Sequence, residues 1–333
     1  MTVEDLRIIG PDAIWKPLPE PTWAVDGIIR EASLTELIAF GGSAKTWMAV
    51  SMVVSIATGL PWLGRFDARK GRALFLDYEN GDYEIRRRLQ RVSRGMGLSG
   101  PVEGLGVGVV PRVYLGSEAF LGAAERACEG VQVCVIDTLR AASPGQDEND
   151  SNIRAGLDDL RRVSEATGTA FLVLAHAKKQ TKDKDLDPRE AGRGSSAIFD
   201  AADSVIHVQF TGPNEPQVVK QTKARLGRFF QPFEVRVDDV DNDGTVVRAA
   251  DVGAGETTLR GSAAGYSHQI LRLVRSCPGR YSTNALAQEI GARRQTIQQV
   301  VGRMADSGEL ERRDHRLWPT GQDDVGGCFD DLL

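Results

Sequence analysis

The segment LIAFGGSAKTWMAV, residues 37–50, joins an apolar run to a helical pattern through a turn that contains two glycines and ends in Lys-Thr. In such an arrangement, successive backbone N–H groups and the amino end of a helix form a cradle for anions. Lys45 is placed to reach the outer phosphates of a nucleotide, and Thr46 to put its hydroxyl on Mg²⁺. The segment therefore predicts a phosphate-binding loop between a buried strand and a helix.

The loop departs from the pattern G-x-x-x-x-G-K-[ST] at Ala39 and Ala44. Ala44 is the more serious departure, because a Cβ at that position crowds the loop. An ordinary strand–turn–helix with a lysine at the helix start is the alternative interpretation of this segment alone. The residues expected to bind the nucleotide are Gly41, Gly42, Ser43, Ala44, Lys45, Thr46 and Trp47.

Apolar runs alternate with helical patterns on both sides of the loop. Continuous apolar runs cover residues 34–40, 72–77, 131–137 and 169–175. Helical patterns cover residues 46–59, 82–95, 118–128 and 152–167. Strands buried on both faces of a parallel sheet have such continuous runs, so the pattern predicts an α/β fold. Short strand patterns joined by turns in residues 203–251 predict an antiparallel extension of the sheet.

Length and composition predict a globular protein with more than one domain. The chain has 333 residues and a net charge of −5, and 41% of its residues are hydrophobic. We expect an arm at residues 1–30, an α/β core that contains the loop at 31–250, a Gly- and Ser-containing linker at 251–265, a compact unit at 266–320 and an acidic tail at 321–333.

The apolar runs, the start of the chain and the cysteines indicate where in the cell the protein is expected. The longest apolar run, residues 47–60, is shorter than the ~20 residues of a membrane span, and the acidic start does not have the pattern of a signal peptide. The four cysteines form no CxxC pair and are expected to be reduced thiols. These features predict a cytoplasmic protein with no membrane partner.

Polar side chains follow three of the predicted strands. Asp137 ends one strand, where a second ligand of Mg²⁺ is expected beside Thr46, because ligands of parallel sheets bind at these strand ends. Glu79 lies just past another strand and is the candidate general base, with Asp77 as its competitor. His176 ends a further strand and is the candidate for sensing the γ-phosphate or for coupling hydrolysis to a DNA-binding loop.

Taken in order, these segments resemble the RecA/DnaB-type ATPases, specifically the hexameric RepA-type replicative helicases of plasmids and phages. The resemblance covers roughly residues 20–240 and rests on the segments LIAFGGSAKTW, GRALFLDYEN, VCVIDTL, LVLAHAKK, GRGSSAIFDAADSVIHV and KARLG. It implies a RecA-like P-loop core that hydrolyses ATP with Mg²⁺. It assigns Lys45 to phosphate, Thr46 and Asp137 to Mg²⁺, and Glu79 to catalysis.

The resemblance also implies a ring of identical subunits around single-stranded DNA. The polar segment 178–203 matches a loop that faces the channel, and its cations Lys178, Lys179 and Arg193 are expected to contact DNA phosphates. Acids interleaved with these cations leave a solvated loop as the alternative. Lys223 and Arg225 match a pair that crosses to the neighbour's γ-phosphate, where cations stabilise transition-state charge. A solvated face of a strand is the alternative for these two residues.

The compact unit at 266–320 resembles a winged helix-turn-helix, with three predicted helices and a terminal hairpin. Arg293, Arg294 and Gln295 open its third helix and are of types that read base edges and phosphates, so duplex DNA is an expected partner. Protein docking is the alternative role. The acidic tail is a candidate docking segment for a replication partner, or else a plain terminus.

The resemblance, taken with these features, implies a DNA-dependent ATPase motor that acts on single-stranded DNA, with a replicative helicase as the most specific form. Two alternatives stay open. One is a RecA-like recombination or annealing ATPase that coats DNA. The other is a nucleotide-gated DNA-binding regulator with little turnover, in which Ala44 weakens the loop.

Overall fold

The computed structural model describes residues 8–145, 153–177, 196–212, 215–225, 229–240, 243–252, 270–271, 273–274, 277–290, 294–306, 310–314 and 316–319. Contacts divide the chain into two compact units, Met1–Val252 and Gly253–Leu333. Among the residues of these ranges, no helix is both long enough and apolar enough to cross a membrane.

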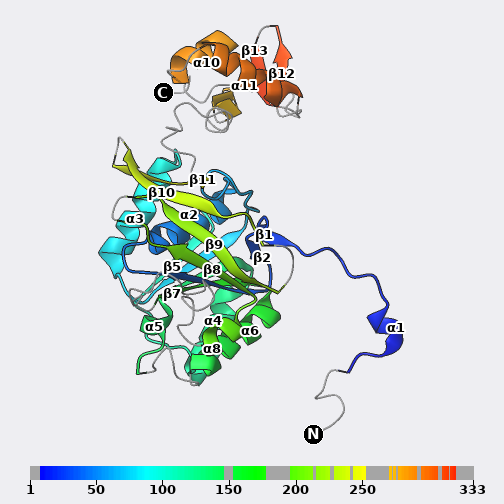
Figure 1. Ribbon diagram of the computed structural model, residues 1–333, viewed down its shortest axis with the longest axis vertical. Helices are drawn as coiled ribbons and strands as arrows, with labels where there is room; N and C mark the ends of the chain where they lie inside the picture. The colour runs from blue at the N-terminus through cyan, green and yellow to red at the C-terminus, as the bar shows by residue number, and fades with distance from the viewer. Residues whose placement is uncertain are drawn as a thin grey trace. The chain divides into compact units, whose positions relative to one another are not determined.

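A nine-stranded sheet forms the centre of the first unit (Figure 1). In spatial order its strands are β11 (Gly244–Asp251), β10 (Phe233–Val240), β9 (Gln217–Ala224), β8 (Ser204–Gln209), β3 (Leu34–Ala39), β7 (Ala170–His176), β6 (Val131–Asp137), β4 (Arg72–Asp77) and β5 (Leu105–Val109). Strands β8 to β5 run parallel to one another, and β9, β10 and β11 are antiparallel. The predicted α/β fold with an antiparallel extension is confirmed.

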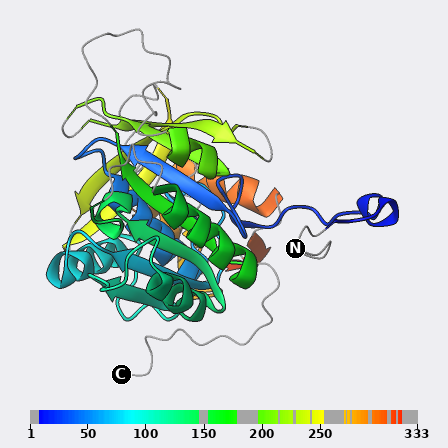
Figure 2. The same ribbon diagram turned by 90° about the horizontal axis from the view of Figure 1, so that it is seen from below.

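Helices cover both faces of this sheet (Figure 2). They are α2 (Lys45–Thr58), α3 (Asp82–Gly95), α4 (Glu118–Cys128), α5 (Leu139–Ala142), α6 (Ile153–Thr167) and α8 (Ser196–Ala201). Strand β6 shows why its run is continuously apolar. Val133 and Val135 pack in the core that contains α2 and α3, whereas Cys134 and Ile136 pack in the core that contains α4, α5 and α6. Successive side chains point to opposite faces, so both must be apolar.

Two features of the sheet and its surroundings differ from the prediction. The core begins before residue 31, because β1 (Trp23–Val25) and β2 (Ile29–Arg30) form a hairpin whose Ala24, Val25 and Ile28 are buried. Residues 8–22, which include the short helix α1 (Pro11–Ile14), are exposed, and their role as an arm stays a prediction.

Strand β5 has no counterpart in the predicted pattern because glycine takes two of its five positions. A Cβ on Gly106 would lie 3.3 Å from Leu74 Cδ1, and one on Gly108 would lie 2.6 Å from Leu76 Cδ2. A side chain at Gly108 would require Leu76 to move, and one at Gly106 would press against Leu74, so glycine fits both positions. Two glycines in five residues interrupt the apolar run by which the other strands were predicted.

The second unit contains α10 (Thr283–Ile290), α11 (Arg294–Asp306) and a hairpin of β12 (Leu310–Arg313) and β13 (Arg316–Pro319). Ile270, Leu286, Val300 and Leu317 belong to its buried core. The winged-helix assignment and its DNA contacts stay predictions. Cys277 is disulfide-bonded, whereas Cys128 and Cys134 are free, so the expectation of four reduced thiols is wrong at Cys277.

Candidate functional site

The glycine-containing loop turns the chain from the end of β3 into α2. Ser43 donates its backbone N–H to the Phe40 carbonyl at 3.2 Å, which closes the turn. Gly42 has φ +81°, a value that favours glycine. The first N–H groups of α2 have no acceptor within their own helix and carry its positive dipole end. The loop therefore has the features required to hold phosphates.

Ala44 also adopts a left-handed conformation, with φ 60° and ψ 9°. An L-residue pays roughly 1–2 kcal/mol for this conformation, whereas glycine does not. The alanine at this position therefore introduces backbone strain into the loop.

We expect Ala44→Gly to raise the free energy of unfolding by up to about 1 kcal/mol, since relief of strain is partly offset by the greater entropy of glycine in the unfolded chain. Ala49→Gly, in the interior of the same helix α2, should instead lower it by about 1 kcal/mol or more. Thermal unfolding of both variants checks the opposite signs. A decrease for Ala44→Gly equal to that for Ala49→Gly would contradict the assignment of strain.

The sheet order brings the predicted metal ligands together. Strand β7 separates β3 from β6, yet Thr46 Oγ1 donates a hydrogen bond to Asp137 Oδ2 at 3.0 Å across the carboxyl edge of the sheet. Asp137 is 1% exposed, and its Oδ1 has no hydrogen-bond partner within the described part of the chain. A hydroxyl beside a buried carboxylate with an oxygen to spare fits Mg²⁺, which prefers oxygen ligands.

Burial changes the chemistry of Asp137. Removal from water raises the pKa of this carboxyl to about 6, against the opposing effects of the Thr46 hydrogen bond and the Lys45 charge, while Glu79 and Asp77 raise it further. Because the folded-state pKa lies above the unfolded one, the stabilising effect of protonation is lost as the pH rises through about 6. Above that pH the charged carboxylate destabilises the ligand-free protein.

Asp137→Asn should therefore stabilise the ligand-free protein at pH 8 by roughly 2–3 kcal/mol, because the amide is neutral at every pH. The gain should shrink toward pH 4. Thermal unfolding at both pH values, without nucleotide or Mg²⁺, is the measurement, with the exposed Asp82→Asn as control. A gain that does not change between the two pH values would rule out charge burial as its cause.

Asp77 and Glu79 have different surroundings, although both are near the end of β4. Asp77 is fully buried, and its carboxylate accepts the backbone N–H groups of Asn80 at 3.0 Å and Gly81 at 2.8 Å. Its oxygens thus hold the turn that leads into α3. The side chain of Glu79, by contrast, is 47% exposed. Glu79 is the carboxylate that can meet water.

His176 lies beside Glu79, with 3.7 Å between His176 Nε2 and Glu79 Oε2. It ends β7, the strand between those of the loop and Asp137. The sequence-predicted Lys45, Thr46, Glu79, Asp137 and His176 therefore all lie along one edge of the sheet. This is the edge where parallel sheets bind ligands.

Asn80 belongs to this edge and was not predicted. Its Nδ2 donates to Asp77 Oδ1 at 2.8 Å and reaches Asp137 Oδ2 at 3.3 Å. The amide thus separates two buried carboxylates and orients the second. No sequence pattern pointed to Asn80 beyond its place next to Glu79.

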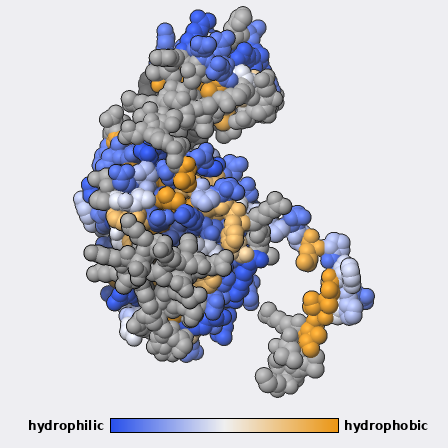
Figure 3. Space-filling view, viewed as in Figure 1, coloured by the Kyte–Doolittle hydropathy of each residue, from blue (hydrophilic) through white to orange (hydrophobic). Residues whose placement is uncertain are grey.

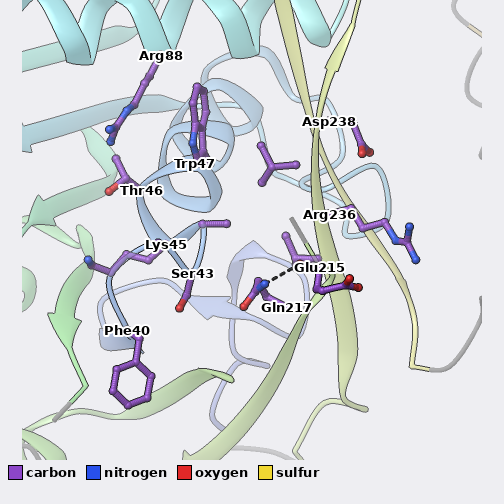
Figure 4. A pocket seen from close by; sticks show the side chains of 14 residues that line it. Phe40, Ser43, Lys45, Thr46, Trp47, Arg88, Glu215, Gln217, Arg236 and Asp238 are labelled. Carbon is purple, nitrogen blue, oxygen red and sulfur yellow. Dashed lines mark hydrogen bonds between the residues drawn. The ribbon is translucent and has the colours of Figure 1, made fainter. Parts of the chain in front are cut away.

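A cavity of about 360 Å³ opens beside the loop. Figure 4 shows Thr46, Trp47 and Arg88 on one side and Arg236 and Asp238, from β10, on the other. The Arg88 guanidinium lies 5.5 Å from the centre of the Trp47 ring, a cation–π distance. Arg88 was not predicted as a site residue, because the many charged residues of its helix α3 are typical of a surface helix.

Lys223 and Arg225 lie far from this cavity in the same chain. Ala224 pairs with Ser204, which pairs with Thr35 near the start of β3, whereas the loop follows the other end of that strand. The strand residues between these points span at least roughly 13 Å. The two cations are therefore at the opposite edge of the sheet from the loop of their own subunit.

The predicted DNA contacts are only partly within the described residues. Lys178, Lys179, Arg193 and Arg293 lie outside them. Arg294 and Gln295 are exposed in the first turn of α11.

Comparison with known proteins gives the family of the chain. A sequence family described as an AAA domain matches residues 5–182, more than half of the chain. This match contains the loop, Glu79, Asp137 and His176.

Two solved structures are similar at low sequence identity. One, described as a DnaB-like replicative helicase and its interactions with primase, has a TM-score of 0.49 and 13% identity over 71% of this chain and 66% of that chain. The RadB recombinase has a TM-score of 0.48 and 12% identity over 67% of this chain and 93% of that chain. The present chain thus spans just under two thirds of the first of these proteins.

The sheet order, the loop between β3 and α2, and the Thr46–Asp137 pair agree with the family match. The predicted RecA-like P-loop ATPase core is confirmed, and the chain belongs to the AAA domain family.

Proposed function

We propose that this protein is a DNA-stimulated ATPase motor whose identical subunits assemble around single-stranded DNA, with replicative DNA unwinding as its specific task. The observation that carries the ATPase part is the convergence of Thr46, Asp137 and Glu79 beside the phosphate loop. The DNA and assembly parts rest on the resemblance and on the positions of the cations outside this edge.

The chain's own residues divide the work of hydrolysis. Lys45 and the backbone of residues 41–46 hold the phosphates, and Thr46 and Asp137 would hold Mg²⁺. When bound, Mg²⁺ neutralises charge on the phosphate oxygens. Glu79 accepts a proton from the attacking water. The oxygen of that water bonds to the γ-phosphorus, while the bond between the γ-phosphorus and the oxygen that bridges to the β-phosphate breaks. His176 lies within reach of Glu79 and senses whether the γ-phosphate is still attached to the nucleotide.

Under this proposal, residues of a second subunit complete the nucleotide site. Arg225 and Lys223 are too distant to reach the nucleotide of their own chain, so they act on a neighbour's. The exposed apolar residues before the core support subunit contacts: Trp15 and Leu18 are both 87% exposed and Ile8 is 67% exposed. Figure 3 shows hydrophobic residues along this arm. Such exposed apolar surface is typical of a segment that another surface covers.

The C-terminal unit supports a contact with duplex DNA. Arg294 and Gln295 are exposed on α11, and Arg312 and Arg316 are exposed on the hairpin, while the apolar residues of both elements are buried. An exposed arginine and glutamine at a helix amino end, with further exposed arginines on the hairpin, are side chains of the types that contact phosphates and base edges.

The test is ATP hydrolysis by the full chain with and without single-stranded DNA, for the wild type, Lys45→Ala and the exposed control Lys70→Ala. We expect turnover that DNA stimulates in the wild type and control and that is lost in Lys45→Ala. Separation of a forked duplex should then require ATP.

Two other outcomes would overturn the proposal in favour of its alternatives. ATP binding without turnover, together with sequence-specific binding of duplex DNA, would indicate the regulator and give Ala44 a functional consequence. DNA-stimulated turnover by open filaments, with no strand separation, would indicate a recombination or annealing ATPase.

A further inference from the structure

The carboxyl end of the short helix α8 collects three cationic side chains from two other elements. Lys223 Nζ donates to the Phe199 carbonyl at 2.5 Å and lies 5.0 Å from the centre of the Phe199 ring. Arg225 Nη2 donates to the Asp200 carbonyl at 2.7 Å, and Arg161 Nη2 donates to the Ala201 carbonyl. The last carbonyls of a helix carry its negative dipole end and attract cations.

Asp203 joins these cations to the central sheet. Its Oδ1 lies 3.3 Å from Arg225 Nη1 and 3.4 Å from Arg161 Nη2. Its Oδ2 accepts the backbone N–H of Leu34 at 3.0 Å, at the first residue of β3. Its own N–H donates to the Leu34 carbonyl, and its carbonyl accepts the N–H of Arg225. Both the backbone and the guanidinium of Arg225 are therefore fixed by one residue.

This arrangement restricts long side chains that would otherwise be free at a surface. Lysine and arginine lose roughly 1.5–2 kcal/mol of rotamer entropy when they are held in one conformation. Arg225 is 42% exposed and Asp203 only 23% exposed, so the guanidinium keeps a solvent-facing side while its other side is anchored. An anchored cation with an open face is pre-organised to meet an anion from outside.

We propose that Asp203 is a positioning residue for the Lys223–Arg225 pair: together with the carboxyl end of α8 and Arg161, it holds Arg225 in the orientation that reaches the nucleotide of the neighbouring subunit. The inference rests on the proposed function, because it supposes that Arg225 acts across a subunit interface. It adds a residue that touches neither nucleotide nor metal and acts only through Arg225.

The test uses the full chain and the variant Asp203→Asn, which keeps an acceptor for the Leu34 N–H and removes the negative charge beside Arg225. We expect kcat for ATP hydrolysis to fall at least about tenfold, because small misplacement of a reacting group costs up to ~100-fold. The Kd for ATP and the subunit number should be unchanged. Arg161→Gln should lower kcat in the same direction, whereas Arg162→Gln, 69% exposed on the same helix, should not.

A double-variant cycle separates positioning from general damage. If Asp203 acts through Arg225, adding Asp203→Asn to Arg225→Ala should lower kcat no further. Losses that multiply would overturn the inference, and so would an unchanged kcat in Asp203→Asn. If Arg225→Ala itself leaves kcat unchanged, the interfacial role in the proposed function fails first. Thermal unfolding of each variant shows whether the fold is retained. If Asp203→Asn does not fold, Asp203→Glu replaces it; this variant keeps the charge but moves it by one methylene, so we expect a fall in kcat that is again absent when it is added to Arg225→Ala.

Discussion

Replacing Glu79 with glutamine is expected to reduce kcat for ATP hydrolysis by about 10²–10⁴-fold, the usual contribution of a general base. Glutamine keeps the size and hydrogen-bonding oxygen of the side chain but cannot accept the proton of the attacking water. The Kd for ATP should change little, because Lys45 and the loop backbone hold the phosphates. Single-turnover hydrolysis and equilibrium nucleotide binding measure the two quantities separately.

Asp82→Asn is the matched control for this prediction. Asp82 is 63% exposed in the first turn of α3, and its side chain pairs with the exposed Arg86. Loss of this charge should leave kcat unchanged. A small effect of Glu79→Gln, within the range of the control, would exclude Glu79 as the base. Asp77 would not replace it readily, since its oxygens hold the turn before α3.

The second large effect is expected at Arg225. Arg225→Ala should lower kcat by about 10³-fold or more, because a cation supplied to the transferring phosphate from a neighbour contributes 10³–10⁵-fold. Arg65→Ala is the control, because Arg65 is similarly exposed at 38% and forms a surface ion pair with Asp251. Its loss should leave hydrolysis unchanged.

Mixed assemblies test whether Arg225 acts across an interface. Subunits with Arg225→Ala keep an intact phosphate loop, and subunits with Lys45→Ala keep an intact Arg225. Each variant should be inactive alone, whereas a mixture should recover part of the activity at interfaces that combine the intact halves. No recovery, despite mixed assembly seen by mass measurement, would show that both residues are required in the same subunit.

The sequence by itself determined the phosphate loop and most strands of the parallel part of the sheet, with the glycine-containing strand β5 as the exception. The strands predicted at 72–77 and 131–137 and the helices at 82–95 and 118–128 have those bounds in the structure. A strand buried on both faces has apolar residues at most positions, so it can be recognised from the local sequence. Local sequence also pointed to Lys45, Thr46 and Asp137, because Lys45 and Thr46 open the helix that follows the loop after such a strand and Asp137 ends another.

Only the tertiary structure separated Asp77 from Glu79, since burial of the first and exposure of the second depend on the neighbouring strand β6 and the turn into α3. The same holds for Asn80, whose amide meets Asp137 from another strand, and for Asp203, whose partners are Leu34 in β3, Arg161 in α6 and Arg225 directly after β9. These contacts join residues far apart in the chain. Spacing along a sequence encodes which face a side chain takes, whereas strand order decides which side chains meet.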